Sequence, residues 1–244
     1  MKIKLWMMKN LYSKIILVGI FAIAMGFMES AVVVYLRAIY YPDGFTFPLQ
    51  NIDGYIGLTE ILREAATMIM LLGIGFLAAR KGIERFAWFI FAFAVWDIFY
   101  YVFLKLILNW PESLLTWDIL FLIPFTWVGP VLAPIINSLT MTILALVILH
   151  FTGRKNNCKV GAIEWSLLIA GSLMIMINYM EDYTAFMMQR FSFIELFASS
   201  KLKEIMELSS RYIPMNFNWY WFIAGELLFF AAIFLIIRKN STTK

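Results

Sequence analysis

Long apolar runs separated by short charged segments dominate this chain. Six of these runs reach the length of about 18 residues that marks a transmembrane helix. They predict membrane spans at about residues 15–40, 58–79, 86–108, 131–151, 161–187 and 217–237. The predicted fold class is therefore an all-α, polytopic membrane helix bundle, and we expect residues 1–244 to form a single integral membrane domain.

The segment from Leu114 to Val128 departs from this pattern. It is short for a span, it contains Asp118 and Pro124, and it leads into Gly129-Pro130 and Pro134. A membrane helix needs about 20 residues, and a proline removes a hydrogen bond from a helix interior. We therefore expect a broken segment on the outer side of the membrane, either re-entrant or lying against the bundle.

A second segment outside the spans, at about residues 192–212, has apolar positions at helical spacing. These positions are Phe193, Phe197, Ile205, Leu208 and Tyr212. Such a pattern predicts an amphipathic helix on the outer membrane surface.

The distribution of basic residues predicts the orientation. With six spans, thirteen of the twenty Lys and Arg fall on the side of the two termini, and four fall in the opposite loops. Basic residues concentrate in cytoplasmic segments, so we expect both termini in the cytoplasm. The short chain, the basic inner loops and the lack of organelle signals favour a bacterial inner membrane.

Composition excludes several classes of protein. The chain is 62% hydrophobic and only 15% charged, whereas soluble domains carry about 25% charged residues. The net charge of +4 comes from residues that flank the spans, so we expect no nucleic-acid partner. The only histidine, His150, and the only cysteine, Cys158, cannot form the multi-histidine or paired-cysteine sites of metalloproteins. Since no phosphate-binding or dinucleotide-binding motif is present either, we predict neither a metal site nor a cofactor.

Ionisable side chains within the spans are the candidate chemistry. Glu60 and Glu64 share one helix face because they are four residues apart, and Arg63 lies beside them. The predicted spans contain seven acids and three bases, all from mid-membrane outward: Glu29, Glu60, Glu64, Asp97, Glu181, Asp182, Glu226, Arg37, Arg63 and Lys105. A charge at the bilayer centre costs about 2.5–3.5 kcal/mol. The surplus acids must therefore be protonated, face water or hold a cation.

Two arrangements satisfy this requirement, and both stay open at this point. In the first, Arg63 pairs with Glu60 or Glu29, Lys105 extends to the interface, and the remaining acids are hydrated. In the second, a polar cavity opens outward beneath the segment from Pro124 to Pro134, and its walls contain Glu29, Arg63, Glu64, Asp97, Tyr101 and Glu226. The candidate ligand-binding residues are Glu29, Arg37, Glu60, Arg63, Glu64, Asp97, Tyr101, Glu181, Asp182 and Glu226.

These residues favour a protein that binds or transports a small cation, such as a proton, a metal cation or an amine. One alternative is an intramembrane enzyme that acts on a lipid, an isoprenoid or a quinone, for which no catalytic residue is assigned. The other alternative is a structural or accessory subunit of a membrane complex. The expected partners are the lipid bilayer, a small cationic or lipid-like ligand, and a second copy of the chain or another membrane protein.

Overall fold

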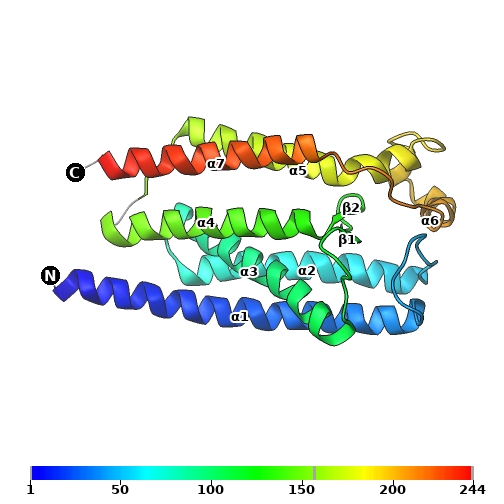
Figure 1. The fold of residues 1–244 in the computed structure, drawn as a ribbon, viewed down its shortest axis with the longest axis horizontal. Helices are drawn as coiled ribbons and strands as arrows, with labels where there is room; N and C mark the ends of the chain where they lie inside the picture. The colour runs from blue at the N-terminus through cyan, green and yellow to red at the C-terminus, as the bar shows by residue number, and fades with distance from the viewer. Residues whose placement is uncertain (1, 156–157, 243–244) are drawn as a thin grey trace.

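Six long helices, packed side by side, make up most of this protein. The computed structural model describes residues 2–155 and 158–242. Within these residues the long helices are α1 (Lys2–Tyr40), α2 (Gly54–Ala78), α3 (Gly82–Leu108), α4 (Leu132–Lys155), α5 (Ala162–Met187) and α7 (Trp219–Thr242). Each contains a stretch long and apolar enough to cross a membrane, which confirms the predicted helix bundle. Both ends of the chain lie at the same end of the bundle (Figure 1).

The segment from Leu114 to Val128 is not a membrane span. It contains strand β1 (Trp117–Phe121), which pairs antiparallel with β2 (Trp127–Pro130). The hairpin lies toward the end of the bundle opposite the termini (Figure 1). The break in the segment was predicted from its prolines, but the strands were not. Their pairing satisfies backbone groups that a broken helix would leave without partners in an apolar surrounding.

The segment at residues 192–212 also differs from its prediction. Instead of one amphipathic helix it forms two short 3₁₀ turns, η1 (Glu195–Phe197) and η2 (Ser199–Lys201), followed by α6 (Leu202–Ser209). The backbone N–H and the hydroxyl of Ser192 both donate to one carboxylate oxygen of Glu195, each at 2.8 Å. Such local side-chain bonds favour a turn over a continuous helix.

Helix α3 is the central helix of the group formed by α1, α2, α3 and α4. It packs against α1, α2 and α4, while α7 packs against α5 and α4. The contact between α1 and α3 depends on two small residues one turn apart, Gly26 and Ser30. A Cβ atom at Gly26 would lie 2.9 Å from the carbonyl oxygen of Trp96 and 3.2 Å from the backbone nitrogen of Tyr100. The Ser30 hydroxyl oxygen lies 2.7 Å from the carbonyl oxygen of Gly26 and 3.0 Å from that of Tyr100, so the two backbones approach closely, as in other membrane helix pairs.

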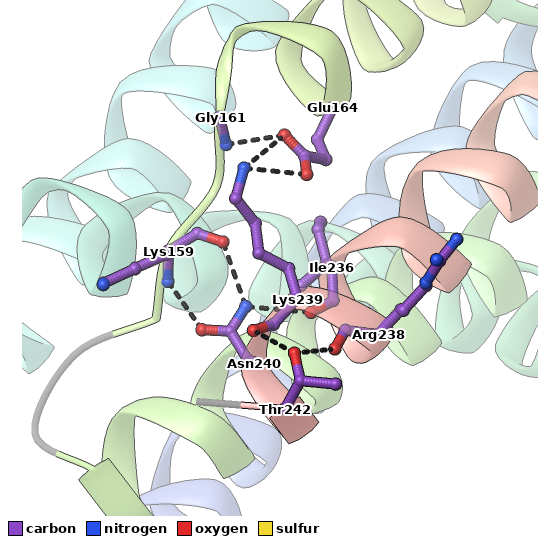
Figure 2. A network of polar contacts seen from close by, with 8 residues as sticks. All are labelled: Lys159, Gly161, Glu164, Ile236, Arg238, Lys239, Asn240 and Thr242. Atoms are coloured by element: carbon purple, nitrogen blue, oxygen red, sulfur yellow. Dashed lines mark hydrogen bonds and ion pairs between the residues drawn. The ribbon is translucent and has the colours of Figure 1, made fainter. Parts of the chain in front are cut away.

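At the end of the bundle that holds the termini, polar contacts join α7 to the start of α5 (Figure 2). The Lys239 ammonium group lies 3.0 Å and 3.2 Å from the two carboxylate oxygens of Glu164. The Asn240 side chain accepts from the backbone nitrogen of Lys159 at 2.8 Å and donates to its carbonyl at 3.0 Å. These bonds hold the last turns of α7 against the segment before α5.

The close approach of α1 to α3 leads to a first prediction. We expect Gly26→Ala to lower the free energy of unfolding by about 1–3 kcal/mol, because an added methyl group would press on backbone atoms that cannot rotate away. Thermal unfolding of the purified protein in detergent micelles measures this change. Gly19→Ala is the matched control on the same helix, since nothing lies within 4 Å of a Cβ atom there. Equal melting temperatures for the two variants would contradict the packing described.

Candidate functional site

A cavity of about 170 Å³ lies between α1, α2, α3 and the hairpin, and we call it the first cavity. Strand β1 and the residue that follows it form one wall, through Asp118, Ile119, Leu120 and Leu122. The structure brings seven of the ten predicted site residues together around this space: Glu29, Arg37, Glu60, Arg63, Glu64, Asp97 and Tyr101. The prediction that the segment from Pro124 to Pro134 covers the cavity was wrong, because β1 and Leu122 form this wall and no residue of that segment is among those that line it.

Arg63 joins carboxylates from two helices. Its guanidinium donates to Glu60, one turn away on α2, at 2.8 Å, and it also donates to Glu29 on α1. The side chains of both acids are only 11% exposed. In an apolar surrounding such a group needs an opposite charge nearby, and here one guanidinium serves two carboxylates.

Arg37 forms a second ion pair at the same end of the bundle. It lies 3.4 Å from one carboxylate oxygen of Asp118, and the Tyr101 hydroxyl donates to the other at 3.2 Å. The guanidinium also lies over two rings, 3.7 Å from the centre of Trp110 and 4.5 Å from that of Phe45, where cation–π attraction stabilises it. Burial raises the pKa of Asp118 to about 6, because it disfavours the charge more than Arg37 and Tyr101 favour it.

Glu64 and Asp97 have no ion-pair partner among the residues that the structure describes. Glu64 accepts a hydrogen bond from the backbone N–H of Leu122 at 2.9 Å, and Asp97 accepts one from the Ser138 hydroxyl at 2.8 Å. Within residues 2–155 and 158–242, neither carboxylate takes part in an ion pair. Both line the first cavity, and the hydrogen bonds that they accept from the described residues come from neutral donors. The charge of Arg63, the residue before Glu64, also attracts the Glu64 carboxylate without forming an ion pair with it.

The first cavity is therefore acidic overall, and its wall is rich in aromatic rings. Five carboxylates and two guanidinium groups line it. The aromatic residues of the wall are Tyr40, Tyr41, Phe45, Trp96, Tyr100 and Tyr101. The face of an aromatic ring attracts cations, so rings and carboxylates favour the same kind of ligand. In the described part of the chain, no three His, Cys, Asp or Glu side chains lie where they could hold a metal ion.

Three predicted site residues are not among those that line this cavity. Glu181 is exposed. Asp182 accepts hydrogen bonds from the Tyr212 hydroxyl at 2.7 Å and from the backbone nitrogens of Met215 and Asn216, so it anchors the loop before α7. Glu226 is buried on α7 and accepts from the Thr140 hydroxyl at 2.6 Å. Depth along a helix does not determine which neighbours a residue meets, and the expected placement of Glu226 in the cavity wall depended on depth alone.

Asp118 is the site residue that sequence reasoning missed. It was seen only as a polar residue within a segment too short to span, and Arg37 had no assigned partner. An acid in a largely apolar segment was the available signal for this pair. Comparisons of the chain with models of known protein families, with curated proteins and with solved structures find no match.

The contrast between the mostly buried ion pairs of Arg63 and an exposed ion pair elsewhere leads to a second prediction. We expect Arg63→Met to lower the free energy of unfolding by about 2–4 kcal/mol, because two mostly buried carboxylates would lose their shared counter-charge. The matched control is Arg211→Met. Arg211 pairs with Glu207 where both side chains are well exposed, at 65% and 58%, and such pairs contribute about 0–1 kcal/mol. Thermal unfolding in micelles measures both changes, and a loss no greater for Arg63→Met would show that the buried pairs do not support the fold.

Proposed function

We propose that this integral membrane protein binds a small organic cation, such as a protonated amine, in the first cavity. The observation that carries the proposal is the pair of acids Glu64 and Asp97, which line the cavity without an ion-pair partner among the described residues. A cation placed between them would supply the charge that the two guanidinium groups do not. Transport of the bound cation across the membrane is the wider role that this site would serve.

The chemistry of the wall favours an amine. An ammonium group is a compact charge with several N–H donors, and hydrogen bonds from it to carboxylates are stronger than those between neutral groups. The rings of Tyr40, Trp96 and Tyr100 supply apolar surface with an affinity for cations. The volume of about 170 Å³ is below the roughly 300–1,000 Å³ of sites for drug-sized molecules, so the ligand should be small.

The proposed orientation places the first cavity on the extracytoplasmic side. Arg80, Lys81 and Arg85 lie between α2 and α3 or at the start of α3, and Lys159 precedes α5. These connections lie at the end of the bundle that holds the termini, whereas the hairpin lies toward the other end (Figure 1). The preference of basic residues for the cytoplasm then puts both termini inside. A bacterial inner membrane is the location that we propose on the same grounds.

A structural role in a membrane complex is the second candidate. The ion pairs themselves favour it, because each joins two elements: Arg63 links α2 to α1, and Arg37 links α1 to β1. Such pairs are compatible with a role in helix assembly alone. The two candidates differ in what Glu64 and Asp97 do, since neither acid joins an ion pair in the described residues.

The third prediction tests the amine site directly. We expect one or more of ethylamine, putrescine and choline to raise the melting temperature of the purified protein, because a ligand that binds only the folded state stabilises it by about 2.7 kcal/mol at 100 times its Kd. The variant that combines Glu64→Gln with Asp97→Asn should weaken this binding by about tenfold or more, equivalent to about 1.4 kcal/mol. Isothermal titration calorimetry provides the affinities.

The control for this experiment is Glu181→Gln, which neutralises an exposed acid outside the cavity and should leave the affinity unchanged. Sodium and magnesium chloride serve as comparison ligands. The amine site would be refuted if no amine stabilised the protein, if only the metal salts did so, or if the double variant bound amines as well as the unmodified chain. Loss of stability without any amine binding would support the structural role.

A further inference from the structure

A second cavity, of about 110 Å³, lies next to the first. Its wall includes Met68 on α2, which is one helical turn beyond Glu64, and Phe93 on α3, which is one turn before Asp97. Both turns lie nearer the end of the bundle that holds the termini, so the second cavity is the deeper of the two. Three residues border both cavities: Trp96, Asp97 and Leu120.

The surface of the second cavity is mostly apolar. Its wall consists largely of aromatic and aliphatic side chains: Met68, Phe93, Trp96, Leu120, Phe121, Trp127, Pro134 and Tyr179. The indole nitrogens of Trp96 and Trp127, the Tyr179 hydroxyl and the amide oxygen of Asn137 have almost no accessible surface. A molecule inside this cavity therefore meets mainly carbon. Such spaces favour apolar guests, since a cavity of about 150 Å³ lined by Leu, Ile and Phe stays dry and binds benzene or xenon.

Asp97 is the charged group at the boundary between the two cavities. One of its carboxylate oxygens accepts from the Ser138 hydroxyl at 2.8 Å, and Ser138 lines the second cavity and not the first. The Asp97 side chain is half-buried, and it borders both cavities. A cation bound to Asp97 in the first cavity would therefore have the second cavity beside it.

The two cavities differ in what they can bind. The first has five carboxylates in its wall. In the second, Asp97 is the one acid among the described residues that line it, and the rest of the wall has no charge. A charged group placed deep in the second cavity would lose its hydration without gaining an opposite charge, which is costly. An amphipathic molecule that extends across both cavities can therefore bind in one direction only, with its charge in the first cavity.

We propose that the second cavity binds the apolar tail of an amine whose ammonium group lies between Glu64 and Asp97. This proposal rests on the amine site described above and adds the class of ligand, an alkylamine with one charged end. The tail passes the side chains of Trp96 and Leu120, the other residues that border both cavities. Scaled from the cavity of about 150 Å³ that holds the six carbons of benzene, the second cavity has room for about four carbons.

The first test is a titration series of n-alkylamines, from methylamine to n-octylamine, against the unmodified protein in lipid nanodiscs. Calorimetric affinities should rise about fourfold with each added carbon, which corresponds to about 0.8 kcal/mol for each buried methylene group. The rise should end after about four carbons. Putrescine is n-butylamine with a second amine at its far end, and it should bind at least tenfold more weakly than n-butylamine, because its second charge would enter the apolar cavity.

A pair of matched variants locates the tail. Phe93 lines the second cavity, whereas Phe89, one turn away on the same helix and also half-buried, lines neither cavity. Phe93→Ala enlarges the second cavity, so the affinity should continue to rise to n-hexylamine or beyond. Phe89→Ala removes the same ring elsewhere, and its affinities should level off at the same chain length as those of the unmodified protein. An equal limit in the two variants would place the tail outside the second cavity and overturn the proposal.

A measurement without any amine tests the apolar cavity by itself. Crystals of the unmodified protein under xenon pressure should show an anomalous peak between Met68, Phe93 and Trp127, and the absence of xenon there would overturn the proposal. Methylamine binding with no gain for n-butylamine, or putrescine binding as tight as that of n-butylamine, would overturn the tail pocket and leave the amine site intact. Xenon binding without binding of any amine would instead refute the amine site, and the class of ligand with it.

Discussion

The guanidinium group of Arg63 holds the hairpin end of this bundle together. Helix α2 packs mainly against α3, so the bond from Arg63 to Glu29 ties α2 directly to α1. In an apolar medium a carboxylate that lost this partner would have to take up a proton or move toward water. This bond therefore fixes α1 against α2 together with the packing of both helices on α3, and the first cavity lies where these two helices meet α3 and β1.

The need for an opposite charge divides the charged groups of the first cavity into two sets. One set forms ion pairs that stabilise the fold, and the other remains available to a ligand. Arg63 compensates Glu29 and Glu60, and Arg37 compensates Asp118. Two of these pairs join different elements, since Arg63 links α2 to α1 through Glu29 and Arg37 links α1 to β1 through Asp118. Among the described residues, Glu64 and Asp97 accept hydrogen bonds only from a backbone amide and a hydroxyl, which compensate a negative charge less completely than a cation does. These two acids are therefore the residues at which we expect a function, although most of the charged groups that line the first cavity belong to the ion pairs beside them.

Much of the bundle could be predicted from the sequence, because crossing a bilayer depends on local composition. Glu60, Arg63 and Glu64 were recognised for the same reason, since their spacing places them together on any helix. The hairpin was not predicted, because its strands gain stability only by pairing with each other and packing on helices far away in the chain. The pairing of Arg37 with Asp118, 81 residues apart, depends on the hairpin and could not be derived without it.

Glu226 shows a different limit of prediction. Its depth was estimated from its position in an apolar run, but depth leaves open which helix lies opposite. In the structure α4 supplies its partner, Thr140, and Glu226 lines neither cavity. Asp97, which was expected at a similar depth, lines both cavities instead. Two acids at the same depth therefore need not share a site, because the helix face on which each lies decides which neighbours its side chain meets.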